Sequence, residues 1–355
     1  MKILILQPRF EVYGGAELVI VRLCNYLSEK NIEHVLLTSN ILSDVRRDLK
    51  KTEVIVPIES FDPFNDIRVY LKNNINNFTL FNLHNHPAEV LFYPYKRPSV
   101  WNCNEPSTMI MFGKEVPKEH IEAGQNISKI IVSDQYNQER IKKVYNKDSI
   151  IINYGIDIDF WSAKLDKEEL RSKFHLENKF VLIHIGWFNE FKNQFHSLEA
   201  VHSLVKEIPN IKLLFVGFDN TSLGELCKKY VLDNSLENNV EFFGHINRNT
   251  LRQLLNCSDL GLFPYYEQGG WLSPFETLCA GVPIVVYPRT LSSRVIKENN
   301  LGIVSTSLKS TILDFYKDPI PYHSLTRNAL NYIKKNMTWE QFCSRCLEVY
   351  KEVSE

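Results

Sequence analysis

The segment from Phe263 to Pro283 constrains the fold more than any other part of the chain. An apolar run at 260–263 ends at a proline, and a polar turn with two glycines follows at 267–270. The next residues, 274–280, have a helical pattern with proline at the start and glycine just past the end, which are usual helix signals. A second apolar run follows at 284–287. The segment predicts a strand, a turn, a helix and another strand in direct succession.

The same segment predicts an anion site. A Gly-Gly turn leaves backbone N–H groups accessible, and the positive end of the helix dipole points toward the same place. We therefore expect a phosphorylated ligand at this turn.

Apolar runs alternate with helical patterns along most of the chain, and polar residues follow the runs. This order is typical of doubly wound α/β domains, whose sites lie at the carboxyl ends of the strands. A segment with the character of a hinge, 154–160, separates two such series. We expect an N-terminal Rossmann-like domain at 1–160, joined by an amphipathic helix at 338–355, and a second one at 161–337, with a cleft between them.

Composition excludes several classes of protein. The 355 residues are 44% hydrophobic and 23% charged, with a formal net charge of -1, so no bulk field favours nucleic acid. Seven scattered cysteines form no disulfide framework, which favours a reducing, cytoplasmic setting. The first apolar run is too short for a signal peptide, and no run approaches the ~20 residues of a membrane span. Peripheral contact with the inner face of a membrane is compatible with this composition.

Six short motifs occur in a fixed order. They are Gly14-Gly15-Ala16-Glu17, Tyr154-Gly155-Ile156-Asp157, Gly186 with Lys192, Phe243-Gly244-His245-Ile246, Glu276 with Ala280-Gly281 and Pro283, and Trp339-Glu340. In this order and spacing the sequence resembles the retaining glycosyltransferases of family 4, which have the GT-B fold of two facing Rossmann-like domains. The resemblance covers nearly the whole chain.

The resemblance implies a binding site for a nucleotide-sugar donor. Gly14 and Gly15 would approach the donor diphosphate, where the lack of a Cβ allows close contact. Lys192, six residues after Gly186, would place a positive charge on the diphosphate and help it leave. Glu276 would bind the ribose hydroxyls, because two carboxylate oxygens suit a vicinal diol. The other donor contacts implied are His245 and Ile246 for the nucleobase and Gly269, Gly270, Trp271 and Leu272 for the sugar and phosphates.

Three positions depart from the family pattern. Trp187 stands where an arginine usually follows the glycine, which removes one cationic contact with the diphosphate. Gln268 stands where the first glutamate of the motif is expected, so either the loop is shifted and Glu267 takes that place or an amide replaces the carboxylate. Asn104 replaces a histidine that commonly occurs at this point of the family pattern. Glutamine and asparagine still form hydrogen bonds, but neither titrates near neutral pH. Together with Lys192, Gln268 and Asn104 are the candidate catalytic residues. The family reaction relies on positioning and leaving-group stabilisation more than on a protein base.

Three further residues are candidate contacts for acceptor or sugar. His84 and His86 follow a strand in the first half of the chain, and Glu105 follows the next one. Loop histidines held by their own hydrogen bonds are an equally weighted alternative. Two histidines at this spacing do not make a metal site without a third ligand, and no metal or other cofactor is expected.

The sequence thus predicts a cytoplasmic glycosyltransferase that moves a sugar from a nucleotide diphosphate to a hydroxyl of a glycan or lipid-linked acceptor. The departures motivate a second hypothesis, a catalytically weak homologue serving as a partner subunit or glycan-binding module. A nucleotide-sugar epimerase on the same fold is a third. An NAD enzyme is disfavoured, because Gly14-Gly15 does not continue into the dinucleotide-binding fingerprint.

Overall fold

The computed structural model describes residues 1–57, 60–103, 115–266 and 271–355. The chain divides into two compact units, the first made of Met1–Gly155 with Trp339–Glu355 and the second of Ile156–Thr338. The predicted boundary after residue 160 falls inside a short helix of the second unit, α8 (Ile158–Trp161). In the second unit, the Ile156 amide donates a hydrogen bond to the Met337 carbonyl (2.8 Å), so the incoming and outgoing segments of this unit are paired.

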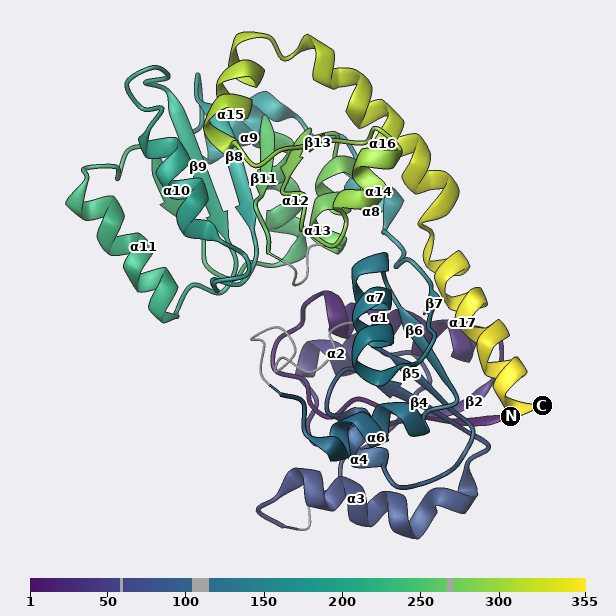
Figure 1. The fold of residues 1–355 in the computed structure, drawn as a ribbon. Coiled ribbons are helices and arrows are strands. Elements are labelled where there is room, and N and C mark those ends of the chain that lie inside the picture. The colour runs from purple at the N-terminus through teal and green to yellow at the C-terminus, as the bar shows by residue number, and fades with distance from the viewer. Residues whose placement is uncertain (58–59, 104–114, 267–270) are drawn as a thin grey trace. The chain divides into compact units, whose positions relative to one another are not determined.

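The first unit is built on a seven-stranded parallel sheet with the order β3-β2-β1-β4-β5-β6-β7 (Figure 1). Its strands are β1 (Lys2–Leu6), β2 (Glu33–Leu37), β3 (Glu53–Ile55), β4 (Leu80–His84), β5 (Ser99–Asn102), β6 (Lys129–Val132) and β7 (Ile150–Ile151). Its α-helices are α1 (Gly15–Glu29), α2 (Ser43–Asp48), α3 (Pro63–Asn74), α4 (Ala88–Phe92), α6 (Lys118–Asn126), α7 (Gln135–Tyr145) and α17 (Trp339–Ser354), with a 3-10 turn η1 (Ile75–Asn77).

The second unit is built on a six-stranded parallel sheet with the order β10-β9-β8-β11-β12-β13. Its strands are β8 (Phe180–Ile185), β9 (Ile211–Val216), β10 (Val240–Phe242), β11 (Leu260–Phe263), β12 (Ile284–Val286) and β13 (Ile303–Val304). Besides α8, its helices are α9 (Lys167–Lys173), α10 (Gln194–His202), α11 (Ser222–Asp233), α12 (Arg248–Cys257), α13 (Leu272–Cys279), α14 (Ser293–Glu298), α15 (Leu308–Lys317), η2 (Ile320–Tyr322) and α16 (His323–Asn336).

Each sheet has one point at which the strand order reverses. In the first sheet the chain runs outward from β1 through β2 and β3, then returns to β4 on the other side of β1. In the second sheet the corresponding neighbours are β8 and β11. Ligands of doubly wound sheets bind outside the carboxyl ends of the strands at such a switch point. The predicted doubly wound architecture is confirmed, and it defines two places to look for function.

Helix α17 belongs to the core of the first unit, although the whole of the second unit precedes it in the sequence. It packs against α1, β4 and β5, and buries Phe342, Cys346 and Tyr350 among its contacts. The hydroxyl of Ser354 lies 3.5 Å from the sulfur of Met1, so the two labelled chain ends are neighbours (Figure 1). Burial of this apolar face stabilises the helix in its position, because an amphipathic helix of this length is marginal alone.

All seven cysteines are buried. Burial raises the pKa of Cys24 to about 12, which keeps that thiol protonated and unreactive. Among the described residues, no helix combines the length and the hydropathy needed to span a membrane.

Candidate functional site

The switch point of the second sheet brings together two residues singled out in the sequence, Gly186 and Lys192, with a tyrosine that was not. Strand β8 ends at Ile185, and Gly186 follows with φ at +157°. Tyr265 follows the neighbouring strand β11, is fully buried, and its hydroxyl donates to the carbonyl of Ile185. A Cβ on Gly186 would lie 3.2 Å from that hydroxyl and 3.3 Å from the Lys192 Cδ. Gly186, Tyr265 and Lys192 are therefore packed in direct contact.

Lys192 is placed by this packing. Its ammonium nitrogen lies 4.1 Å from the centre of the Tyr265 ring, and its own amide donates to the Asn189 side chain at 2.9 Å. A cation over an aromatic face is attracted to the ring. The arrangement holds a positive charge at the switch point, where an anionic ligand of this fold would bind.

His184 lies beneath this edge and has a structural role. It is fully buried in β8, and its Nδ1 lies 2.9 Å from the hydroxyl of Ser197. Burial, with a smaller contribution from the charge of Lys192, lowers the pKa of His184 to about 3. A neutral imidazole below the site adds no positive charge to that of Lys192.

Glycines line the ends of three neighbouring strands. Gly186 follows β8, Gly217 follows β9 and Gly244 follows the residue after β10. The Gly186 amide donates to Val216 (2.7 Å), and the Gly217 amide donates to Gly244 (2.9 Å). A Cβ on Gly217 would lie 2.1 Å from the Gly186 carbonyl oxygen, so only glycine fits. The sequence analysis missed Gly217, although a glycine directly after each apolar run was a usable signal.

The loop after β10 carries the predicted nucleobase residues. His245 is exposed and Ile246 is half-buried. Asn247 then caps α12, because its side-chain oxygen accepts from the Thr250 amide at 2.9 Å. The hydrogen bond between Gly217 and Gly244 ties this loop to the neighbouring strand end. The structure therefore places His245 and Ile246 at the same sheet edge as Gly186.

Glu276 lies on α13, which follows β11. Burial raises the pKa of its carboxyl to about 7. The positive charge of Arg248 opposes this rise, whereas the negative charge of Asp157 adds to it. Arg248 also forms an ion pair with Asp157. Glu276 is thus a carboxyl group whose charge changes near neutral pH, inside the second unit.

The start of α13 contains an unpaired donor. Trp271 is 4% exposed, and its ring lies 5.2 Å from that of Phe275. Its indole N–H has no hydrogen-bond partner among the described residues. Buried donors normally have acceptors, so an orphan at a helix start is compatible with a ligand that supplies one. Leu272 is the first residue of α13, and the helix begins two residues earlier than predicted because Pro274 fits the first turn.

Trp187 occupies the position where the family pattern has arginine. It is 42% exposed, and its ring packs edge-on against Phe218 at 5.5 Å. The substitution therefore replaces a charged side chain with an aromatic pair at the sheet edge. Gln268, Gly269 and Gly270 lie outside the described residues, as do Asn104 and Glu105.

In the first unit, Gly14 and Gly15 form the N-terminus of α1. Gly14 has φ at -110°, a conformation open to any residue, so its backbone does not require glycine. Its amide donates to the Glu17 carboxylate at 3.0 Å. The Gly14 amide belongs to the backbone that is predicted to approach the diphosphate. In the structure, this amide is already hydrogen-bonded to a side chain of the same helix.

The prediction that His84 faces a ligand is wrong for this structure. His84 is the last residue of β4, fully buried, with its Nε2 lying 2.7 Å from the Asn82 side-chain oxygen. Burial lowers its pKa to about 3. The neighbouring Asn102 side chain lies 3.4 Å from the same nitrogen, and Tyr350 of α17 covers Asn102. Helix α17 packs against β4 and β5, and His84 is a neutral core residue in this environment.

His86 lies two residues beyond β4 and is 23% exposed. Its Nδ1 lies 2.6 Å from the Oε1 of Glu89, and its ring centre lies 5.1 Å from that of His120. Asn85, between the two histidines, donates to the Gln7 side chain after β1 at 3.3 Å. This bond links the ends of β4 and β1, so His86 stands at the switch point of the first sheet.

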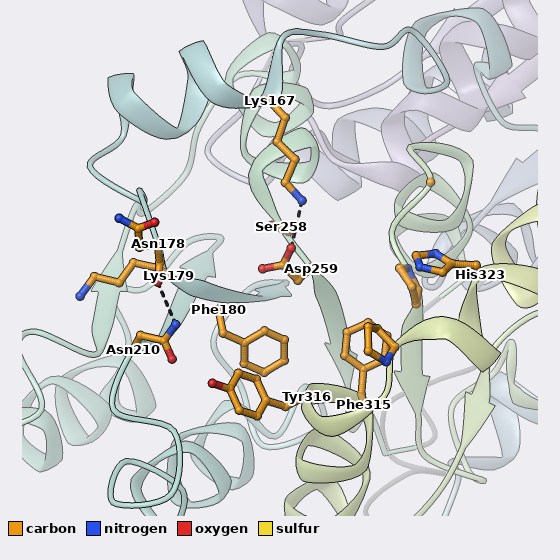
Figure 2. Close-up of a pocket in the computed structure, with 13 residues that line it drawn as sticks. Lys167, Asn178, Lys179, Phe180, Asn210, Ser258, Asp259, Phe315, Tyr316 and His323 are labelled. Atoms are coloured by element: carbon orange, nitrogen blue, oxygen red, sulfur yellow. Dashed lines mark hydrogen bonds and ion pairs between the residues drawn. The ribbon is translucent and has the colours of Figure 1, made fainter.

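A separate cavity of about 500 Å³ lies at the opposite, amino edge of the second sheet (Figure 2). Phe180 begins β8, and Asp259 directly precedes β11. Figure 2 shows Lys167 reaching Asp259, at 2.9 Å. Asp259 also forms an ion pair with Arg171 (2.7 Å) and accepts a hydrogen bond from the Val181 amide (2.9 Å). Its negative charge is therefore paired within the second unit. This cavity contains none of the predicted site residues.

Comparison with known proteins supports the same division of the chain. Residues 166–332, within the second unit, match the family described as Glycosyl transferases group 1. An uncharacterised glycosyltransferase of Methanocaldococcus jannaschii is 25% identical over 60% of this chain and 54% of its own length. An Escherichia coli UDP-Gal:alpha-D-GlcNAc-diphosphoundecaprenol alpha-1,3-galactosyltransferase is 28% identical over 41% of this chain and 38% of its own length. The chain thus matches about half, or less, of these relatives.

Solved structures match over almost the whole chain. Anabaena HepE in complex with UDP-glucose superposes with a TM-score of 0.84, covering 99% of this chain and 100% of that one, at 17% identity. A likeness at this identity establishes the fold. Most of the second unit therefore matches the family Glycosyl transferases group 1, in a chain whose two parallel-sheet units have the GT-B fold.

Proposed function

We propose that the protein is a retaining glycosyltransferase of family 4. It transfers a sugar from a nucleotide diphosphate donor to a hydroxyl of a glycan or lipid-linked acceptor. The observation that carries the proposal is the contact of Lys192 with Gly186 and Tyr265 at the switch point of the sheet that matches the family. A cation beside a close-packed glycine edge suits a diphosphate.

The second unit is the donor domain in this proposal. Lys192 stabilises the charge that develops on the departing diphosphate, and Glu276 accepts hydrogen bonds from the ribose hydroxyls. The indole N–H of Trp271 donates a hydrogen bond to the sugar or its phosphate. The ligand thereby supplies the acceptor that this N–H lacks among the described residues. HepE was solved with UDP-glucose, which supports a nucleotide sugar as donor here.

The first unit holds the acceptor. The similarity to a galactosyltransferase named for a diphosphoundecaprenol-linked acceptor supports a lipid-linked or glycan hydroxyl. The enzyme works in the cytoplasm, in peripheral contact with the inner face of the membrane where such an acceptor is presented. No metal or other cofactor takes part, since the lysine supplies the charge that a metal would bring.

A second candidate function is a catalytically weak homologue that binds glycans or a partner subunit. The exposed aromatic pair of Trp187 and Phe218, standing where the family pattern has an arginine, favours this candidate. It predicts loss of affinity for nucleotide diphosphates rather than loss of the fold.

A panel of nucleotide sugars tests the proposal. UDP-glucose, UDP-galactose, GDP-mannose and ADP-glucose are each incubated with the protein, and thermal stabilisation and release of nucleotide diphosphate are measured. We expect one donor to raise Tm and to be slowly hydrolysed. Absence of both effects, with no calorimetric binding of UDP, GDP or ADP, would favour the binding module. Conversion of the sugar without acceptor or hydrolysis would instead identify an epimerase.

A further inference from the structure

Two large aromatic side chains are exposed together at the carboxyl edge of the second sheet. Trp187 is the second residue after β8, and Phe218 is the second residue after the neighbouring strand β9. They are 42% and 38% exposed, and their ring centres lie 5.5 Å apart. Single exposed apolar residues are common on protein surfaces, whereas contiguous ones beside a ligand edge indicate a binding surface. The aromatic pair is therefore a candidate contact for a ligand.

Hydrogen bonds of the backbone fix the place of this pair. The Gly186 amide donates to the Val216 carbonyl (2.7 Å), and the Phe188 amide donates to the Phe218 carbonyl (3.0 Å). Phe188 itself is 2% exposed. Trp187 thus lies between two residues that are bonded to the β9 segment. A surface held in this way loses little conformational entropy when a ligand binds.

The position of the pair along the edge suits one part of a nucleotide sugar. In the strand order β10-β9-β8-β11, the pair bridges the ends of β9 and β8. Gly186 and Lys192 lie on the β11 side, in contact with Tyr265. The loop after β10, which is the predicted nucleobase loop, lies on the other side. The pair therefore lies between the residues assigned to the diphosphate and those assigned to the base.

The loops after β9 and β10 are also close to each other. A Cβ on Gly244 would lie 3.7 Å from the Asp219 Oδ1, and Asp219 directly follows Phe218. Neighbouring strands are about 4.8 Å apart, so the step from β8 to β10 is roughly 10 Å. This span is within the length of one nucleotide.

The chemistry of the two rings selects a flat, aromatic ligand. Bases stack on aromatic side chains, and this contact accepts any base because every base has a π-face. A saccharide can also lie against an aromatic ring. Continuity with Gly186 and Lys192 favours the base, because a donor bound there carries its base and its diphosphate in one molecule.

We propose that Trp187 is the stacking residue for the nucleobase of the donor, with Phe218 as a positioning residue that holds the indole. The inference rests on the proposed transferase function and deepens it. The family pattern has an arginine at position 187, which would contact the diphosphate. Tryptophan at this position moves one contact from the phosphates to the base. The protein should therefore depend on the base for affinity more than on the phosphates.

The fluorescence of the full chain tests the contact directly. Trp187 is exposed, whereas Trp101, Trp161 and Trp271 are buried and Trp339 is half-buried. The wild type is titrated with UDP, GDP, ADP and pyrophosphate. We expect the nucleotide that binds most tightly to quench the emission, and pyrophosphate to leave it unchanged. Trp187→Phe should bind the same nucleotide within about fivefold of the wild type, with most of the quenching lost.

Calorimetry separates the base from the phosphates. Trp187→Ala should raise the Kd of the best nucleoside diphosphate about tenfold or more and leave that of pyrophosphate unchanged. Phe218→Ala should change the ratio of the two constants in the same direction by a smaller factor. A purely structural role for the pair would lower resistance to urea without changing this ratio, so the ratio decides between the two.

Tyr316→Ala is the matched control. Tyr316 is 41% exposed, and its ring lies 5.1 Å from that of Phe180 at the amino edge of the same sheet. This variant should keep the wild-type ratio of the two constants.

Three outcomes would overturn the inference. Equal nucleotide affinity in the wild type and a folded Trp187→Ala would remove the base from Trp187 and leave the transferase function standing. Quenching by methyl α-glucoside, with none by any nucleotide, would assign the pair to a glycan and favour the second candidate function. If no nucleoside diphosphate binds the wild type, the inference and the proposed transferase function fail together.

Discussion

The carboxyl edges of the two sheets have different chemistry, although the sheets share one topology. The edge of the second sheet is made of backbone, with Gly186, Gly217 and Gly244 linked by hydrogen bonds and Lys192 packed beside Gly186. The edge of the first sheet is made of side chains, with His86 and Asn85 at its switch point. Bare backbone suits a ligand that must approach closely, such as a diphosphate. Imidazole and amide groups suit hydroxyls and protons.

The contrast also explains where each edge tolerates change. A glycine edge is limited by sterics, since any added carbon meets a neighbouring chain. A side-chain edge is limited by hydrogen bonding, since a residue of similar shape can replace another if the bonds are kept. The predictions below test this difference from the largest expected effect to the smallest.

Gly217→Ala should break the second edge. The new Cβ would lie 2.1 Å from the Gly186 carbonyl oxygen, and residue 217 has φ at +143°. We expect a loss of about 3 kcal/mol of unfolding free energy, together with loss of nucleotide binding. Urea denaturation and calorimetry with UDP measure the two effects.

Gly14→Ala is the matched change in the first unit. Its φ is ordinary, and the new Cβ would lie 3.3 Å from a Glu17 carboxylate oxygen on a flexible side chain. We expect its cost to stay below about 1 kcal/mol. Equal losses of unfolding free energy in Gly217→Ala and Gly14→Ala would show that the two edges do not differ in their steric limits.

Lys192→Ala should weaken binding of the diphosphate specifically. Loss of a charge-assisted hydrogen bond costs about 2 kcal/mol, which is roughly 30-fold in Kd. Uridine, which lacks phosphates, should bind the variant and the wild type alike. Lys179→Ala, at the amino-edge cavity of the same unit, is the control and should leave UDP affinity unchanged. A similar loss in both lysine variants would remove Lys192 from the site.

Glu276→Gln should flatten the pH dependence of stability in the second unit. The folded pKa is raised to about 7 from the ordinary 4.5, so the protonated carboxyl is the form that the fold favours. The contribution of protonated Glu276 to the free energy of unfolding is fully present below pH 4.5 and is lost as the pH rises through about 7. We expect a gain for the variant, relative to wild type, on the order of 1 kcal/mol between pH 5 and pH 8.

Denaturant unfolding at the two pH values checks this. Glu177→Gln, which changes an exposed glutamate of the same unit, should behave as wild type. If the Glu276→Gln difference is the same at pH 5 and pH 8, the carboxyl does not titrate in this range.

Much of the fold was predictable because buried parallel strands are continuous apolar runs. The expected strands at 260–263 and 284–287 coincide with β11 and, but for one residue, with β12. Helix α15 was missed, although its buried residues Leu308, Thr311, Ile312 and Phe315 have helical spacing. There the signal was present and was not used.

The site was less predictable, because it depends on contacts between distant segments. The environment of His84 includes helix α17, whose packing against β4 no local pattern reveals. Tyr265 was not singled out either, since an aromatic residue after a strand most often belongs to the core. Its hydroxyl bond to Ile185 and its ring below Lys192 appear only in three dimensions.

The return of α17 to the first unit has a consequence for synthesis on the ribosome. Residues 1–155 emerge first, yet they lack the helix that covers β4, β5 and α1 until the second unit has been made. The second unit is contiguous, so it can fold while the first still waits with apolar surface uncovered. In this chain the domain begun first is completed last, and the nascent first unit is the stage at which a chaperone would be needed most.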